Sequence, residues 1–170
     1  DGSETVIGAS PTEAKGLLSA FLLFTEGELR MAASRGFPPR DQNLLLPADK
    51  GALEQVLTSG NPILVNEPAG DAELSQFIGL METKAVYILP LIRGLNAFGV
   101  LLFAHSDAAF FTPDRCDLLE MVGNQAVIAI QNARLFQDLS LEKERIVQTQ
   151  EDAQKKLARD LHDGPTQSVS

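Results

Sequence analysis

Two apolar runs separated by a short turn dominate the hydrophobic pattern of the chain. They read AVYILPLIRG (residues 85–94) and AFGVLLFAH (residues 97–105), with a turn at residues 94–96. Because nearly every position is apolar, the pattern predicts an antiparallel hairpin in a sheet that is covered on both faces. Pro90 cannot donate a backbone hydrogen bond, so an irregularity is expected there in the first strand.

A second hairpin is predicted near the start of the chain. LLSAFLLF (residues 17–24) reads as a buried strand, residues 26–27 as a turn, and ELRMAASRG (residues 28–36) as the returning strand. Upstream, SPTE (residues 10–13) has a capping serine, a proline in the first turn and a glutamate that closes a capping box. Since the strand begins at Leu17, the helix that starts there can only be short.

Between the two hairpins, the pattern predicts a loop, a helix, a short strand and a weaker helix. These elements cover residues 37–47, 51–59, 62–68 and 71–81, in that order. Gly60 follows the first helix and is expected to end it. In the second helix, Leu74, Phe77 and Ile78 recur at helical spacing and would share one side.

One long helix is predicted to begin after the second hairpin. Thr112, Pro113 and Asp114 supply a cap, a proline in the first turn and an acidic side chain near the helix N-terminus. An apolar stripe along the next turns is expected to pack on the sheet. Its members are Leu118, Leu119, Val122, Ala126, Ile130 and Ala133.

From about residue 135 the same helix becomes rich in charged residues and glutamines. An apolar residue recurs every seven positions, at Leu139, Ile146 and Ala153. Glu142 and Thr149 occupy the alternate core positions of this weak heptad. After Ala153 the next apolar residues, Leu157 and Leu161, follow at intervals of four residues, and this spacing interrupts the repeat. A helix without an apolar face has little reason to be stable alone, so a parallel homodimeric coiled coil is favoured over a lone solvated helix.

Composition and charge exclude several classes of binding partner and site. The 170 residues are 44% hydrophobic, enough for a core, and their formal net charge of −9 argues against a nucleic-acid-binding surface. Cys116 is the single cysteine, so neither an internal disulfide nor a cysteine-based zinc site can form. No apolar run reaches the roughly 18 residues of a membrane span. We therefore expect a cytoplasmic location, with any membrane anchor of the parent protein outside these residues.

The order of the elements and several local motifs resemble a GAF domain, a small-molecule sensor module. The motifs are LRMAASRG, ALEQVLTSGNPILVNE, VYILPLIRGLNAFGVLLFA and FFTPDRCDLLEMVGNQAVIAIQNARLF. The resemblance implies an α+β fold over residues 1–136, with an antiparallel sheet flanked by helices, followed by a long C-terminal coiled-coil signalling helix. GAF domains usually open with a full helix beside the exit helix, and here that helix is short or missing.

The stretch ARDLHDGPTQ resembles the phospho-acceptor box of sensor histidine kinases, in the subfamily that reads H-D-x-x-x-Q. The resemblance implies that residues 137–170 hold the signalling helix and the truncated start of a dimerisation and phosphotransfer domain. It also implies that His162 accepts phosphate from ATP and passes it to an aspartate of a response regulator. Asp163 would act as general base, and Gln167 would position water for dephosphorylating that regulator.

The residues themselves suit this chemistry. A neutral imidazole supplies a lone pair near pH 7, and a neighbouring carboxylate can hold its tautomer and take up a proton. Arg159 and Lys155 lie three and seven residues before His162, roughly on its face, where they can attract phosphate. Pro165 predicts a bend just after His162. The residues alone equally allow an alternative, in which Gly164-Pro165 ends the helix and His162 is an exposed histidine of its last turn.

Phosphotransfer from ATP also needs a nucleotide-binding domain. Neither G-x-x-x-x-G-K-[ST] nor G-x-G-x-x-G occurs in the chain, so these residues alone should be unable to phosphorylate themselves. ATP and Mg²⁺ are expected only in the full-length parent, a sensor histidine kinase. A second class of function stays open, namely a non-catalytic ligand-binding or dimerisation GAF module coupled to a different output domain.

Neither a cofactor nor a metal ion is expected in this part of the protein, and the GAF ligand is left open. Bilin-binding GAF domains use a pocket cysteine, whereas Cys116 is expected, partly buried, in the first turn of the exit helix. Haem would need an axial ligand such as His105, but a histidine that ends a strand is more often hydrogen-bonded or solvent-facing. A pocket for a small molecule is expected between the sheet and residues 62–82. Tyr87 and Phe103 are expected in the core.

Overall fold

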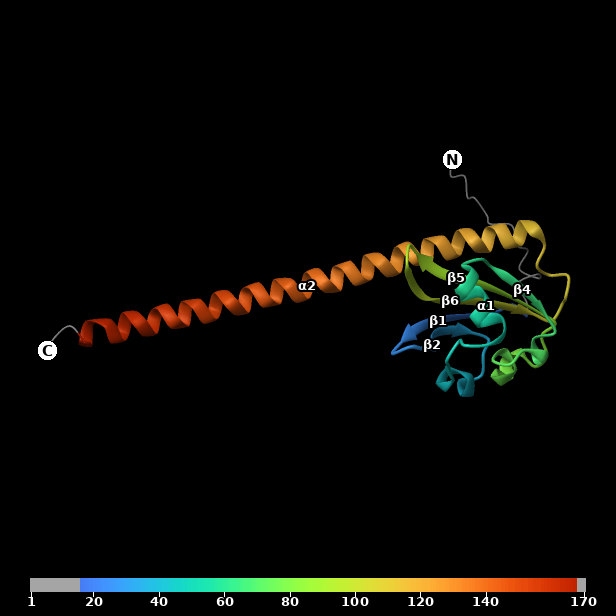
Figure 1. Ribbon diagram of the computed structural model, residues 1–170, viewed down its shortest axis with the longest axis horizontal. Coiled ribbons are helices and arrows are strands. Elements are labelled where there is room, and N and C mark those ends of the chain that lie inside the picture. The colour runs from blue at the N-terminus through green and yellow to red at the C-terminus, as the bar shows by residue number, and fades with distance from the viewer. Residues whose placement is uncertain (1–15, 168–170) are drawn as a thin grey trace, which may run out of the picture. The chain divides into compact units, whose positions relative to one another are not determined.

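The computed structural model describes residues 16–167, with side chains for residues 16–163. It has an α+β fold, in which a six-stranded sheet is accompanied by one short and one long helix (Figure 1). Residue contacts divide the chain into two units, Asp1–Val127 and Ile128–Ser170, and each is described by itself. The helix start predicted at residues 10–13 lies outside the described residues.

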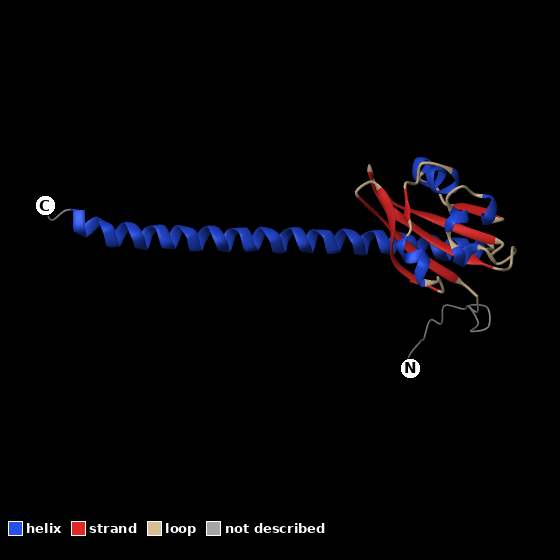
Figure 2. Ribbon diagram, turned by 90° about the horizontal axis from the view of Figure 1, so that it is seen from below, coloured by secondary structure: helices blue, strands red, loops and turns tan. Residues whose placement is uncertain are grey.

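Six strands form a single antiparallel sheet (Figure 2). They are β1 (Leu18–Thr25), β2 (Glu28–Arg35), β3 (Leu45–Leu46), β4 (Ile63–Asn66), β5 (Ala85–Arg93) and β6 (Asn96–His105). Their order in the sheet is β3-β2-β1-β6-β5-β4. Both predicted hairpins are confirmed, as β1–β2 and β5–β6. Pairing of β1 with β6, from Leu18 opposite Ala104 to Leu23 opposite Gly99, joins the two hairpins.

Strand β5 is buried along most of its length, as its apolar run predicted. Its alternate residues enter two hydrophobic clusters, one on each face of the sheet. Pro90 pairs in regular register with Val100, because β4 ends its pairing at Ile88 and requires no N–H from residue 90. The predicted irregularity lies slightly further along, where the register shifts between Leu91 and Ile92.

One face of the sheet is covered by α1 (Gly51–Ser59) and by short 3-10 turns. The helix is confirmed as predicted: Leu53 and Val56 are fully buried against the sheet. Gly60 ends it in the left-handed conformation (φ 69°), and its N–H donates to the Val56 carbonyl at 2.9 Å. A residue with a side chain would be strained at this φ, which explains the glycine.

Two segments differ from the predicted elements. Residues 37–47, expected to be a loop, contain a 3-10 turn, η1 (Pro39–Asn43), and strand β3. Residues 71–81, expected to form a weak helix, instead form two 3-10 turns, which follow η2 (Pro68–Gly70). These turns are η3 (Leu74–Gln76) and η4 (Ile78–Leu80).

The cause of the second difference is a pair of hydrogen bonds between residues that are distant in sequence. Asp41 is buried, and its two carboxylate oxygens accept the N–H groups of Ile78 at 2.9 Å and Gly79 at 2.8 Å. These donors are therefore not free for an α-helical ladder. Leu74 and Phe77 are buried as their spacing indicated, but Ile78 is 44% exposed.

The opposite face of the sheet carries the first turns of α2 (Pro113–Gln167). Its predicted start is confirmed, because Thr112 Oγ1 accepts the Arg115 N–H at 3.4 Å. The sheet-facing stripe is rotated from the predicted one: Leu118 and Val122 are 39% and 47% exposed. The residues on the buried side are Cys116, Leu119, Gly123 and Val127.

Gly123 explains the rotation of α2. A Cβ placed on Gly123 would lie 3.7 Å from Leu89 Cδ1 and 3.9 Å from Leu101 Cδ1, so the helix backbone approaches the sheet at its smallest residue. The closest packing is thus achieved at a glycine, and Leu118 and Val122 of the predicted stripe stay exposed.

The second unit contains the rest of α2. Its large apolar side chains are exposed within the chain, including Leu135 at 60%, Leu139 at 69% and Ile146 at 50%. Of the helices that the structure describes, none has the length and apolarity needed to cross a membrane.

Candidate functional site

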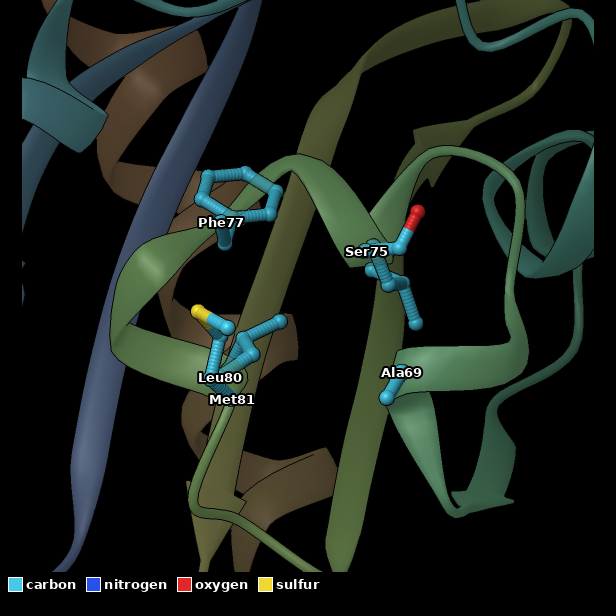
Figure 3. A pocket seen from close by; sticks show the side chains of 6 residues that line it. Ala69, Ser75, Phe77, Leu80 and Met81 are labelled. Atoms are coloured by element: carbon cyan, nitrogen blue, oxygen red, sulfur yellow. The ribbon is translucent and has the colours of Figure 1, made fainter.

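A small pocket opens among the 3-10 turns on the α1 face of the sheet (Figure 3). Its volume is about 180 Å³, and it is lined by Ala69, Leu74, Ser75, Phe77, Leu80 and Met81. All six lining residues belong to the predicted segment 62–82, but the pocket was expected between this segment and the sheet. None of the six lining residues belongs to a strand, so the pocket is formed by the turns themselves.

The lining has a buried floor and an exposed rim. Leu74, Phe77 and Leu80 belong to the core and are at most 2% exposed, whereas Met81 is 69% exposed. Figure 3 shows Phe77, Leu80 and Met81 on one side of the pocket, with Ser75 and Ala69 on the other. A molecule in the pocket would therefore touch the hydrophobic core directly.

Asp71 fixes the turn that forms one wall of the pocket. Its Oδ1 accepts the N–H groups of Glu73 and Leu74, each at 3.0 Å, and its Oδ2 accepts the Ala52 N–H at 2.8 Å. The carboxylate thus links the first turn of α1 to η3. Together, the Asp71 and Asp41 carboxylates fix the 3-10 turns that line the pocket, in a segment that forms no α-helix.

Glu73, next to the floor residue Leu74, is a fully buried carboxyl group. Its Oε1 accepts the Ala48 N–H at 2.8 Å, whereas its Oε2 has no hydrogen-bond partner among the described residues. Burial is the main cause that raises the pKa of Glu73, and the nearby Asp49 carboxylate adds to the increase. Protonation of this side chain is therefore easier in the folded protein than in the unfolded chain.

We expect a Glu73→Gln variant to gain stability relative to wild type as the pH rises from about 4 to neutral. Because the pKa is raised in the folded state, that state binds more protons than the unfolded chain, and wild type loses free energy of unfolding as pH rises through this window. Glutamine cannot ionise and keeps an oxygen for the Ala48 N–H. Urea unfolding across this range, with the exposed Glu54→Gln as control, measures the effect. A stability difference between Glu73→Gln and wild type that stays constant with pH would contradict it.

A polar contact lies under α2 on the other face of the sheet. The Tyr87 hydroxyl donates to Glu120 Oε1 at 3.0 Å, and Tyr87 and Phe103 are both buried, as predicted. Burial raises the pKa of Tyr87 and that of the Cys116 thiol. Cys116 is partly buried in the first turn of α2, as expected, and a protonated thiol there is poorly reactive.

A second hollow, of about 210 Å³, lies beside this contact. It is lined by Gly60, Pro62, Leu89, Pro90, Ile92, Glu120, Gly123 and Asn124.

His105 ends β6 and is hydrogen-bonded, as expected of a histidine in that position. Its ring is 9% exposed and stacks on Phe110, with ring centroids 4.0 Å apart. Nδ1 accepts the Asp107 N–H at 2.9 Å, and Nε2 has no partner among the described residues. The described part of the chain holds no group of three or more side chains arranged to bind a metal ion.

The predicted phospho-acceptor residues belong to the second unit. His162 and Asp163 are both exposed on α2, as are Arg159 and Lys155, about one and two turns earlier. The backbone stays helical through residues 164–165 and on to Gln167. The helix therefore does not end at Gly164-Pro165, as the alternative supposed, whereas the bend after His162 and the role of His162 stay predictions. The side chain of Gln167 lies outside the described residues.

Comparison with known proteins decides the family. The family model of the GAF domain matches residues 12–130. The chain belongs to the GAF domain family. The GAF domain of a two-component sensor histidine kinase from Bacillus halodurans, a solved structure, has the same fold. It superposes with a TM-score of 0.60 at 18% identity, over 70% of this chain and 84% of that one.

Curated relatives of this GAF domain belong to proteins with different outputs. An "uncharacterized sensor-like histidine kinase" from Chloroflexus aurantiacus is 32% identical over 143 residues, which are 84% of this chain and 24% of that protein. The formate hydrogenlyase transcriptional activator FhlA from Escherichia coli is 28% identical over 100 residues, 55% of this chain and 14% of FhlA. This chain thus spans about a quarter or less of the length of these relatives.

Proposed function

We propose that this chain is the signal-sensing and phospho-acceptor part of a two-component sensor histidine kinase in the cytoplasm. In the full-length protein, ATP phosphorylates His162, which passes the phosphoryl group to an aspartate of a response regulator. The observation that carries the proposal is the exposed pair His162 and Asp163 on α2, the helix whose first turns pack on the sheet of the GAF domain. The similarity to a sensor-like histidine kinase over 84% of the chain supports it.

The proposed reaction is an in-line displacement at the γ-phosphorus of ATP. One ring nitrogen of His162 forms the N–P bond, the bond from phosphorus to the β–γ bridging oxygen breaks, and ADP leaves. The Asp163 carboxylate holds the imidazole tautomer and takes up the ring proton. Gln167, one helical turn after Asp163, orients water for dephosphorylating the regulator.

ATP and Mg²⁺ would be held by another part of the full-length protein. The chain contains neither glycine-rich phosphate-binding motif and covers 24% of its kinase relative. We therefore expect the 170 residues alone to be inactive as a kinase.

The proposed homodimer is supported by a continuous seam of exposed side chains on α2. The core positions of a heptad alternate in steps of three and four residues. Continued from Leu139 toward the N-terminus, these steps place six residues in the seam: Leu135, Asn132, Ile128, Gln125, Met121 and Leu118. The four apolar members are 39–65% exposed within the chain. In the first unit, these positions lie on the side of the helix opposite Leu119 and Gly123, which face the sheet. A second copy of α2, in parallel, would cover this seam.

We expect Leu139→Lys to weaken dimerisation of the 170-residue chain by at least about 100-fold, because it brings two lysines together in the seam. Leu141→Lys is the matched control, since Leu141 is as exposed as Leu139 (64% against 69%) but lies outside the seam. Sedimentation equilibrium measures the dissociation constants. A monomeric wild type, or equal weakening by both substitutions, would show that α2 does not pair through this seam.

A second candidate function is a non-catalytic ligand-binding or dimerisation module that feeds a different output. The similarity of residues in this GAF domain to transcriptional activators such as FhlA favours it. The sequence that follows Ser170 in the full-length protein discriminates between the two. A second helix and an ATP-binding domain support the kinase, whereas a different output domain supports the module.

The kinase proposal is tested by incubating the full-length protein with radiolabelled ATP and Mg²⁺. We expect incorporated phosphate that is lost in acid and retained in alkali, because the N–P bond of phosphohistidine is hydrolysed by acid. Absence of incorporation, or phosphate that resists acid as serine and threonine esters do, would overturn the proposal.

A further inference from the structure

We propose that the pocket among the 3-10 turns binds a neutral, apolar molecule about the size of a benzene ring. The inference names the class of ligand that the sensor domain takes. It rests on the proposed function only for the use of that ligand as a signal, since binding itself needs nothing beyond the GAF domain.

The lining lacks groups that would hold a charged ligand. None of the six lining side chains carries a charge, and Ser75, the single hydroxyl among them, already lies 3.4 Å from the Ala72 carbonyl as a donor. An anion such as a carboxylate would lose its hydration without gaining a cationic partner here. Apolar contacts, in contrast, are available from the whole floor of the pocket.

The backbone donors around the pocket are also occupied. Five of the six lining residues donate their N–H within the same segment, to the Asp71 side chain or to carbonyl groups three or four residues earlier. These residues are Leu74, Ser75, Phe77, Leu80 and Met81. No row of free N–H groups is therefore presented to a phosphate or carboxylate, as it would be in an anion-binding loop.

The size of the pocket sets the size of the ligand. An apolar cavity of about 150 Å³ in another protein stays dry and binds benzene or xenon. The pocket here, at about 180 Å³, is similar in volume and also lined by leucine and phenylalanine. Nucleotides and tetrapyrroles are far too large for it.

The geometry of the pocket favours binding without a large rearrangement. Asp71 and Asp41 fix the turns through five hydrogen bonds to backbone N–H groups, so the floor is formed before a ligand arrives. The rim residue Met81 is exposed, and the unbranched thioether side chain of methionine can adapt to the face of a small aromatic or aliphatic molecule.

The test compares benzene with benzoate, which adds a negative charge to the same ring, on the 170-residue chain. Methyl NMR spectra should show saturable shifts for Met81, Leu74 and Leu80 with benzene and none with benzoate. Ala69→Leu, which fills the pocket from its exposed rim, should weaken benzene binding at least tenfold. Ala72→Leu, the same change at an exposed position outside the lining, should leave binding unchanged.

Three outcomes would overturn the inference: no saturable shift with benzene, equal binding of benzoate, or equal effects of the two leucine substitutions. None of these would affect phosphorylation of the full-length protein. Failure of phosphorylation would likewise leave the benzene result unchanged, so the two proposals can fail separately.

Discussion

Replacing Gly99 with alanine is expected to lower the free energy of unfolding by about 3 kcal/mol or more. Gly99 lies in β6 between Leu23 on β1 and Leu91 on β5, with a φ of 155°. A Cβ at this position would overlap the carbonyl oxygen of Leu22 and lie 2.9 Å from Cα of Leu23. Because both atoms are backbone, relief requires moving β1 away from β6, and this pairing joins the two hairpins.

Urea unfolding followed by the fluorescence of Tyr87 measures this effect. Tyr87 is the single tyrosine, the chain has no tryptophan, and the residue is buried in the GAF domain. Gly123→Ala is the matched control: its Cβ would make ordinary contacts at 3.7 Å or more, and alanine favours a helix by about 1 kcal/mol. A Gly99→Ala protein as stable as wild type, or equal losses for both substitutions, would show that β1 and β6 are not packed as described.

Local patterns in the sequence were enough to predict the hairpins, α1 and the start of α2. Each depends on residues that are close in sequence, such as the continuous apolar run of β5 or the capping of α2 by Thr112. The pocket region was also predicted, because loops that cover a sheet commonly hold ligand sites.

The features that could not be predicted from the sequence depend mainly on contacts between residues that are distant in the chain. Asp41 accepts hydrogen bonds from Ile78 and Gly79, which are 37 and 38 positions further along the chain. These bonds explain why 3-10 turns form in place of the predicted helix, and no local pattern signals them. Asp71 was missed despite a local signal, since an aspartate three residues before Leu74 has the spacing of a side-chain cap. The orientation of α2 was predicted from its widest apolar stripe, whereas packing favoured the closest approach, at Gly123.

Replacing His162 with glutamine in the full-length protein is expected to abolish phosphate incorporation from ATP. Glutamine is similar in polarity but has no nucleophilic lone pair on nitrogen, so the N–P bond cannot form. His162 is exposed, so the substitution should leave the fold unchanged. His105→Gln is the matched control, because this chain contains two histidines and His105 lies in the GAF domain. The His105→Gln protein, checked for folding by circular dichroism, should still incorporate phosphate.

In the proposed function, a signal-sensing GAF domain is joined by α2 to a histidine at position 162 that becomes phosphorylated. Mapping the phosphorylated residue by tandem mass spectrometry, on full-length protein labelled with ATP and kept at alkaline pH, tests it most directly. We expect phosphohistidine at His162. Phosphate at His105, on a hydroxyl side chain, or at a histidine outside these 170 residues while His162 stays unmodified would contradict it.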